Sequence, residues 1–331
     1  MKKALVTGGS GFIGSNLVKK LSSQGWQVDI VDDLSNGDLA FLEDLNTQVA
    51  WESKDNDYTG HFTREPRQDN DIHILVCDFT DDLVLDRIIN REYDTVFHLA
   101  ANPRVEASVD QPYETTELNI LKTVKLFDAC RNNVKRIVFS SSSAVYGEVE
   151  VLPTIESELK SPKSPYAWHK SAIEDFSKMC YDLYKLDVVC LRYFNVYGPN
   201  QLGDSPYSTA ISAWCNAIDK GLQCRSDGDG TQTRDMCYVD DVVNANILAA
   251  NSGKTFKGEC YNIASGDRVS NNEILEYFRI KHGADIVHSK WRPGDVMHTH
   301  ADISKAKRDL GYEPMTNIWK GLKETIKWWE L

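Results

Sequence analysis

Short apolar runs alternate with amphipathic segments along the first part of the chain. Apolar positions recur at helical spacing in Ser15–Ser23, Leu83–Asn90, Asn119–Asn132 and Ala167–Tyr184. The apolar runs between them are too short for buried helices and therefore indicate strands. These runs are Ala4–Thr7, Val28–Val31, Ile74–Cys77, Thr95–His98, Arg136–Phe139 and Val188–Leu191. Strands that alternate with helices predict an α/β fold, with a parallel sheet that is covered on both faces.

Two regions depart from this alternation. Trp51–Asp71 is polar, acidic and aperiodic, and we interpret it as a surface insertion between the second and third strands. A partner-binding loop is the alternative interpretation. After Leu191 the pattern is less regular, with turn signals at Gly198-Pro199 and Asp227–Gly230. We therefore expect a second, smaller lobe to begin there.

A glycine-rich turn, Thr7–Gly14, directly follows the first strand and opens a helix. Gly8 and Gly11 permit a tight turn and the close approach of a pyrophosphate, and Gly14 lets the helix pack near the strand. The helix N-terminus adds N–H donors and the positive end of a dipole. Asp32 ends the second strand, where a carboxylate suits a ribose hydroxyl and repels a 2′-phosphate. The pattern predicts NAD rather than NADP; the alternative is an adventitious turn and a solvated Asp32.

The next two strands end in residues that suit the same crevice. Asp78 and Phe79 place a carboxylate and an aromatic ring where an adenine edge could lie, and Ala100 and Ala101 leave room for a cofactor. Either pair alone is also compatible with plain core packing. The predicted cofactor site comprises Gly8, Gly11, Phe12, Ile13, Gly14, Asp32, Asp78, Phe79, Ala100, Tyr166 and Lys170.

Tyr166 and Lys170 are the candidate reactive pair. They are spaced i and i+4 at the start of a helix after Pro165, so they share one helix face. A free tyrosine is a poor base at neutral pH. We expect Lys170 and a positive nicotinamide ring to lower the pKa of Tyr166 and prepare it for a sugar hydroxyl. A structural Tyr–Lys pair is common, but the serine-rich segment Ser140–Gly147 upstream strengthens the catalytic interpretation.

Charge and cysteine usage narrow the function classes. The net charge of −12 argues against nucleic-acid and acidic-membrane partners, so an anionic ligand must depend on local arginines and backbone N–H groups. No apolar run approaches a bilayer span and the N-terminus does not resemble a signal peptide. The eight cysteines occur singly, which predicts reduced thiols and a cytoplasmic location. We expect no metal site, although His298 and His300 form one close pair.

The chain resembles the nucleotide-sugar epimerase/dehydratase family of extended short-chain dehydrogenases/reductases over nearly its whole length. The resemblance is carried by TGGSGFIG, HLAA, SSSSAVYG, YAWHK, LRYFNVYGP, DGDGTQTRDMCYVDDV, YNIASG, RPGDV, ADISKA and LGYEP, and only Trp51–Asp71 lacks a counterpart. It implies a Rossmann-type doubly wound parallel sheet with a smaller C-terminal substrate-binding lobe. Residues 1–191, with about 236–263, would form the NAD-binding domain, and 192–235 and 264–331 the nucleotide-sugar lobe.

The same resemblance implies roles for individual residues. Ser142 would be the catalytic serine, Tyr166 the base and Lys170 its partner. Bidentate guanidinium groups suit a diphosphate, although arginines in surface ion pairs are the alternative. The substrate site implied by the family comprises Ser142, Asn195 at the diphosphate, the clamp Arg234 and Arg292, Asp295 at the uridine ribose, and the gatekeeper Thr299.

The family resemblance also favours one reaction. Dehydratases and decarboxylases of the family carry acidic groups after the catalytic serine or threonine, and Ala144 cannot do proton chemistry. The sequence therefore resembles a 4-epimerase that works through a 4-keto sugar. Thr299 is small, which implies that UDP-GlcNAc and UDP-GalNAc fit as well as UDP-Glc and UDP-Gal. The segment Ser141–Ser143 also resembles the branch that accepts acetamido sugars and uronates.

Several alternatives stay open at this point. A UDP-glucuronate-type 4-epimerase and another NAD-dependent nucleotide-sugar dehydratase or reductase are the rival enzymes. A non-enzymatic NAD sensor is disfavoured because Tyr166 and Lys170 are both present. By resemblance, Asn119–Asn132 and Ala167–Tyr184 would form the four-helix interface of a homodimer.

Overall fold

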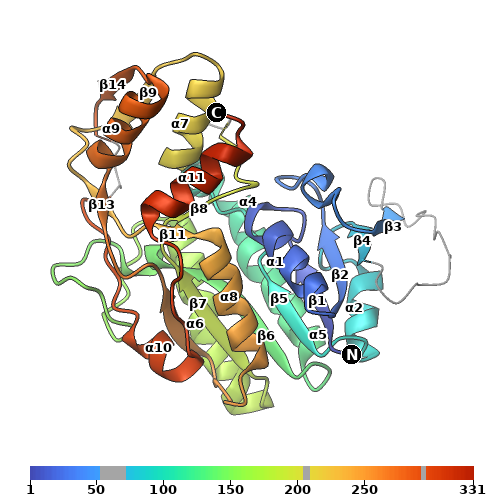
Figure 1. The fold of residues 1–331 in the computed structure, drawn as a ribbon. Coiled ribbons are helices and arrows are strands. Elements are labelled where there is room, and N and C mark those ends of the chain that lie inside the picture. The colour runs from blue at the N-terminus through green and yellow to red at the C-terminus, as the bar shows by residue number, and fades with distance from the viewer. Residues whose placement is uncertain (53–71, 204–208, 292–295) are drawn as a thin grey trace.

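The computed structural model describes residues 1–52, 72–203, 209–291 and 296–331. Its main element is one eight-stranded sheet with the order β12-β7-β6-β5-β1-β2-β4-β3 (Figure 1). Every recorded pairing in this sheet is parallel. The strands are β1 (Lys3–Thr7), β2 (Gln27–Asp32), β3 (Thr47–Glu52), β4 (Ile72–Val76), β5 (Thr95–His98), β6 (Arg136–Ser142), β7 (Val188–Tyr193) and β12 (Glu259–Ile263). The predicted Rossmann-type sheet is confirmed, as are all six strands that the apolar runs predicted.

One boundary of the sequence interpretation is wrong. The segment interpreted as an insertion from Trp51 onward begins inside β3, because Trp51 pairs with Leu75 and Glu52 with Val76 on β4. β3 lies at the edge of the sheet, and its Val49 side chain is 41% exposed. An edge strand does not need the continuous apolar run of a buried strand, so the sequence pattern missed it. Residues 53–71 lie outside the described part of the chain.

Helices cover both faces of the sheet (Figure 1). On one face, Leu17 and Val242, from α1 and α8, join one buried apolar cluster. On the other, Leu85, Leu126 and Ile173, from α2, α5 and α6, join a second. The helices of this domain are α1 (Phe12–Ser23), α2 (Asp82–Ile89), α3 (Val105–Asp110), α4 (Pro112–Thr116), η2 (Glu117–Lys122), α5 (Thr123–Cys130), α6 (Pro165–Tyr184) and α8 (Val239–Asn251).

The segment predicted as one helix over Asn119–Asn132 contains a change of helix type. Its first part belongs to the π-helical turn η2, and α5 continues from Thr123. Such turns are rare and are found frequently at functional sites. Here the turn contains the buried side chain of Asn119, whose contacts are described below.

The order of the strands places a crevice at a defined point. From β1 the chain extends to β2, β4 and β3 on one side and to β5, β6 and β7 on the other. The direction of winding therefore reverses between β1 and β5. In open α/β sheets, ligands bind outside the carboxyl ends of the strands at such a switch point.

Most elements of the C-terminal lobe are short and lie at one end of the sheet, at the upper left of Figure 1, whereas α10 lies at the lower left. The strands of the lobe pair in small sheets, β9 with β14 and β10 with β13, whereas β12 returns to the main sheet beside β7. The domain limits stay a prediction. The lobe's elements are α7 (Ala210–Asp219), β9 (Cys224–Asp227), β10 (Thr233–Arg234), β13 (Val269–Ser270), α9 (Asn271–His282), β14 (Ile286–Ser289), α10 (Ser304–Leu310) and α11 (Ile318–Trp328). In the described residues, no helix combines the length and apolarity that crossing a bilayer requires.

Candidate active site

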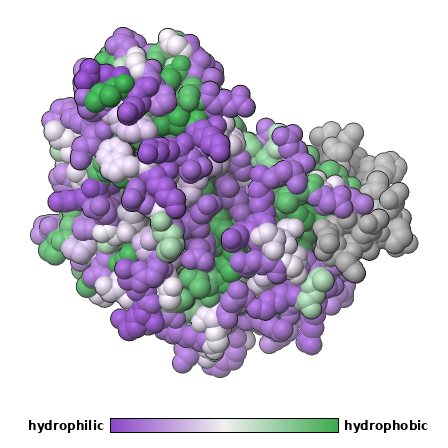
Figure 2. Space-filling model, in the orientation of Figure 1, coloured by the Kyte–Doolittle hydropathy of each residue, from purple (hydrophilic) through white to green (hydrophobic). Residues whose placement is uncertain are grey.

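A cavity of about 940 Å³ lies at the switch point between β1 and β5. Its walls come from the loops at the carboxyl ends of the strands and from the C-terminal lobe. Figure 2 shows the lobe standing out from the sheet domain, and hydrophilic residues cover most of the visible face. Most of the predicted cofactor and substrate residues line this one cavity: Gly8, Gly11, Phe12, Ile13, Gly14, Asp32, Phe79, Ala100, Ser142, Tyr166, Lys170, Asn195, Arg234 and Thr299.

The glycine turn forms one wall, and it leaves no room for side chains at Gly8 and Gly14. Gly8 has a φ of +69°, and a Cβ there would lie 2.9 Å from the Ala100 nitrogen. At Gly14 a Cβ would lie 2.0 Å from the Gly8 carbonyl oxygen. Gly14 is therefore needed for the contact between the helix and the glycine turn itself. The Gly8 N–H donates to Val31 O at 2.8 Å, which ties the turn to β2.

Asp32 is fixed by the backbone around it. Its carboxylate accepts the N–H groups of Ser10 and Leu34, each at 2.9 Å. Burial raises the pKa of Asp32 above its usual value, and these two hydrogen bonds oppose the shift. The carboxylate therefore has a set orientation toward the cavity, as binding of a ribose hydroxyl requires.

Asp78 has a different place from the other predicted cofactor residues. It does not line the cavity, whereas Phe79 does. The Asp78 carboxylate contacts Lys122 Nζ at 2.5 Å and accepts the Thr80 hydroxyl at 2.7 Å. Burial alone would raise the pKa of Asp78, but the hydrogen bonds from Lys122 and Thr80 lower it. Asp78 thus binds the π-helical turn, through Lys122, to the end of β4.

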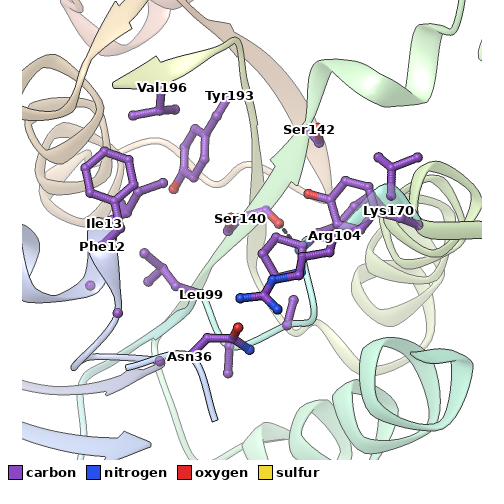
Figure 3. Close-up of a pocket in the computed structure, with 18 of the residues that line it drawn as sticks. Phe12, Ile13, Asn36, Leu99, Arg104, Ser140, Ser142, Lys170, Tyr193 and Val196 are labelled. Atoms are coloured by element: carbon purple, nitrogen blue, oxygen red, sulfur yellow. Dashed lines mark hydrogen bonds between the residues drawn. The ribbon is translucent and has the colours of Figure 1, made fainter. Parts of the chain in front are cut away.

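The candidate reactive groups come from β6 and α6. Ser164 caps α6 by accepting the Ala167 N–H, and Pro165 occupies the first turn, so the helix begins just before Tyr166. Lys170 is buried; its Nζ donates to Ser140 O at 2.7 Å and lies 5.8 Å from the centre of the Tyr166 ring (Figure 3). Ser142 ends β6 and lines the cavity together with Tyr166. Hydroxyl, phenol and ammonium groups therefore meet at one end of the cavity.

The pKa of Tyr166 differs from the expectation based on the sequence. Burial lowers the pKa of Lys170 to about 8. Burial raises the pKa of Tyr166, and the hydrogen bond with Ser142 offsets only part of that shift. The protein alone therefore does not lower the pKa of Tyr166, because desolvation outweighs the hydrogen bond with Ser142. The lowering that a base needs has to come from a further positive charge, such as that of a nicotinamide ring.

The opposite wall is built by side chains from distant parts of the chain. The Thr299 hydroxyl accepts the Asn195 side-chain N–H at 2.8 Å and the Asp235 backbone N–H at 3.1 Å. Arg234 Nη1 donates to the carbonyls of Thr233 and Met297 at 3.1 Å each. Thr299 therefore holds the wall together as well as facing the cavity. The predicted residues Arg292 and Asp295 lie outside the described part of the chain.

Several lining residues were not predicted from the sequence. Asn36, Arg104 and Tyr193 line the cavity and are labelled in Figure 3. Tyr193 is contained in the LRYFNVYGP motif, and Arg104 closely follows HLAA. Because every loop after a parallel strand points to the same edge of the sheet, the positions after β5 could have identified Arg104.

The cavity fits a dinucleotide on the evidence of its own residues. The glycine wall has no room for a Cβ at Gly8 or Gly14, the α1 N-terminus faces the cavity, and a fixed carboxylate stands at the end of β2. This combination suits a pyrophosphate joined to an adenosine ribose.

Comparisons with known proteins agree with this geometry. Residues 4–264 match the NAD dependent epimerase/dehydratase family. A putative UDP-glucose 4-epimerase of Methanocaldococcus jannaschii is 34% identical, over 98% of this chain and 97% of the relative. A Methanobrevibacter ruminantium UDP-N-acetylglucosamine 4-epimerase, solved with UDP-N-acetylmuramic acid, is 37% identical with a TM-score of 0.86, over 99% of this chain and 98% of that one. A Thermotoga maritima UDP-glucose 4-epimerase, solved with UDP-glucose, is 32% identical with the same TM-score and the same coverage. The chain belongs to the NAD-dependent epimerase/dehydratase family, and its cofactor is NAD.

Proposed function

We propose that this protein epimerises a UDP-hexose at C4. The supporting observation is the place of Ala144, which lines the cavity beside Ser142 and Tyr166. Among the described lining residues, the carboxylates are Asp32, Asp33 and Asp38, all on or after β2 at the cofactor end. A dehydratase needs an acid and a base near C5 and C6, and this part of the described cavity supplies no carboxylate for those roles. Proton transfer at a hydroxyl is the chemistry that remains.

The reactive residues have separate tasks in this proposal. Bound NAD supplies reversible hydride acceptance at C4 of the sugar. Tyr166 takes the proton of the 4-hydroxyl and later returns it to the 4-keto sugar. Ser142 hydrogen-bonds the same oxygen, and Lys170 stabilises the phenolate. Asn195, Arg234, Arg292 and Asp295 hold the nucleotide while the hexose turns its other face to the cofactor.

UDP-GlcNAc and UDP-GalNAc are the proposed substrates, with UDP-Glc and UDP-Gal also accepted. Thr299 lines the cavity with a small side chain, which leaves space for an acetamido group. The relatives described above include epimerases named for both UDP-glucose and UDP-N-acetylglucosamine. The alternative functions are those of a uronate 4-epimerase, a dehydratase or a reductase.

We also propose a cytoplasmic homodimer formed through η2, α5 and α6. Large apolar side chains on these helices face solvent, with Leu121 59% and Leu183 63% exposed. A hollow of about 380 Å³ between the helices is lined by Phe127 and Phe176 among others. Burial against a second copy would remove this apolar surface from water. The eight cysteines are all free and buried, in agreement with a reducing compartment.

The test is to incubate purified protein, without added cofactor, with UDP-GlcNAc, UDP-Glc and UDP-glucuronate, and to separate the products. We expect 4-epimers of the first two sugars and protein that already contains NAD. Loss of water from the sugar, or stoichiometric consumption of NADPH, would contradict the epimerase proposal. Light scattering of the same sample should give the mass of a dimer, and a monomer would contradict the interface.

A further inference from the structure

A cation from outside the recognised motifs enters the cofactor side of the cavity. Arg104 follows β5 and is the residue before the first turn of α3. Its side chain lines the cavity, and Figure 3 shows its guanidinium group pointing toward Asn36. Asn36 belongs to the loop that follows Asp32. Arg104 therefore extends from the β5 side toward the β2 side, across from Phe12 and Ile13 of the glycine turn.

The backbone that carries Arg104 is held by two asparagines. The Arg104 N–H donates to the Asn102 side-chain oxygen at 3.1 Å. The Asn119 side chain accepts the Asn102 N–H at 2.9 Å and donates to the Asn102 carbonyl at 3.1 Å. Asn119 belongs to the π-helical turn η2. The π-helical turn therefore fixes the loop after β5 by binding both the N–H and the carbonyl group of Asn102.

Asn119 is held in turn by the helix that carries the reactive pair. His169, next to Lys170 on α6, lies 3.3 Å through Nδ1 from the Asn119 side-chain nitrogen and 2.9 Å through Nε2 from the Thr116 hydroxyl. The Thr116 hydroxyl donates to Pro112 O, so it must accept from Nε2, and Nδ1 must accept from Asn119. Burial lowers the pKa of His169 to about 4. The ring is therefore neutral near pH 7, with one consistent pattern of donors and acceptors.

The charges around Arg104 suit a diphosphate. Asp32, Asp33 and Asp38 line the cofactor end of the cavity, and the protein carries a net charge of −12. The glycine turn offers backbone N–H groups but no side-chain cation. An anionic cofactor would therefore meet a repulsive field unless a cation stands close to it. A guanidinium group binds a diphosphate bidentately and closely.

We propose that Arg104 binds the diphosphate of NAD on the side opposite the glycine turn, and that Asn102, Asn119 and His169 position it there. Arg104 touches the cofactor, whereas the other three residues act through it. The network links cofactor retention to α6, the helix that carries Tyr166 and Lys170. Tight retention of NAD suits an epimerase, because the hydride that NAD accepts from the sugar has to be returned to it. NAD should therefore not dissociate between the two half-reactions.

The first experiment compares Arg104→Ala, Arg104→Lys and Arg279→Ala, an arginine on α9 that pairs with Glu276 outside the cavity. The rate of NAD release from each holoprotein is measured at low and high NaCl, in the absence of sugar. We expect Arg104→Ala to speed release by about 10- to 100-fold, Arg104→Lys less, and Arg279→Ala not at all. Salt should speed release from wild type more than from Arg104→Ala. Release from Arg104→Ala at the wild-type rate would overturn the proposal.

The second experiment asks whether His169 acts through Arg104. His169→Ala and the double variant with Arg104→Ala are compared in the same release assay. If His169 acts by positioning Arg104, then His169→Ala should have little effect on the rate of NAD release once Arg104 is absent. The double variant should therefore release NAD about as fast as Arg104→Ala alone. If the two substitutions instead speed NAD release by factors that multiply in the double variant, His169 has a merely structural role. Because no sugar is present, this result is independent of the proposed epimerase activity.

Discussion

The two walls of the cavity are built in different ways. The cofactor wall is made of backbone: the Thr7–Gly14 turn, with Asp32 held by two main-chain N–H groups. The substrate wall is made of side chains, and Thr299 joins Asn195 across 104 positions of sequence. A backbone wall leaves few tolerable substitutions, whereas a side-chain wall can be altered one residue at a time. The difference indicates how one family keeps its cofactor while its members are named for different sugars.

The largest effect is expected where the two walls meet, at Tyr166. Tyr166→Phe removes the phenolic oxygen but keeps the backbone N–H that donates to Ser108 at 3.0 Å. We expect turnover of the UDP-hexose to fall by at least ~10²-fold, with thermal unfolding near that of wild type. Tyr113→Phe, at a tyrosine that is 73% exposed, is the control. Turnover within a few-fold of wild type would assign the base to another group.

Gly14→Ala should break the cofactor wall alone. The new Cβ would lie 2.0 Å from the Gly8 carbonyl oxygen, so the turn must shift. Overpacking of this kind costs about 1–3 kcal/mol. We expect the purified variant to contain little NAD and to unfold at a lower temperature. Gly253→Ala is the matched control, because nothing lies within 4 Å of its Cβ; equal behaviour of the two variants would contradict the backbone argument.

Thr299→Tyr should disturb the substrate wall alone. An added ring excludes the bulkier sugar, so Thr299→Tyr should lower kcat/KM for UDP-GlcNAc roughly 5- to 150-fold more than Thr299→Val does, whereas kcat/KM for UDP-Glc should be similar in the two variants. Thr299→Val separates size from hydrogen bonding, since it removes the hydroxyl that accepts from Asn195 and Asp235. Thr299→Val should lower kcat/KM for both sugars together, and Thr299→Ser should lower neither. If Thr299→Tyr lowers kcat/KM for the two sugars by the same factor, Thr299 only holds the substrate wall together and does not select the sugar.

The smallest effect concerns the stability cost of Lys170. Its folded pKa of about 8 lies below the ordinary value, so the unfolded chain binds more protons between about pH 8 and 10.5, and stability rises with pH there. At pH 7 the buried charge lowers stability. Lys170→Met should therefore need more urea to unfold than wild type at pH 7. Its free energy of unfolding should be higher by roughly 1 kcal/mol, and this difference should shrink toward pH 10.5. Lys125→Met, at a lysine that is 54% exposed, should show no such trend.

The parts of the molecule that depend on neighbouring residues could be predicted from the sequence. The six apolar runs gave six strands of the sheet, and the glycine turn with Asp32 lines the cavity as expected. The half-exposed edge strand β3 was missed because it carries no continuous apolar run. Neighbouring sequence likewise placed Tyr166 and Lys170 on one face of α6.

The features that depend on distant contacts could not be predicted in this way. Lys122 reaches Asp78 from 44 positions away, and His169 reaches Asn119 from 50 positions away. The raised pKa of Tyr166 depends on burial, which no i and i+4 spacing specifies. The position of Arg104 after β5 indicates the edge of the sheet to which it belongs, but its approach to Asn36 depends on β5 and β2 lying on either side of β1.

The return of β12 to the main sheet has a consequence for biosynthesis. The outer edge of β7 pairs with β12, which is translated only after α7 and α8. Until Ile263 has left the ribosome, the backbone groups along that edge of β7 have no strand to pair with. Unpaired edges recruit strands from other chains. Nascent chains that stop between residues 194 and 258 should therefore aggregate more than the finished chain, in which β12 pairs with β7 and Lys305 from α10 donates to Cys260 O of the new edge strand at 2.9 Å.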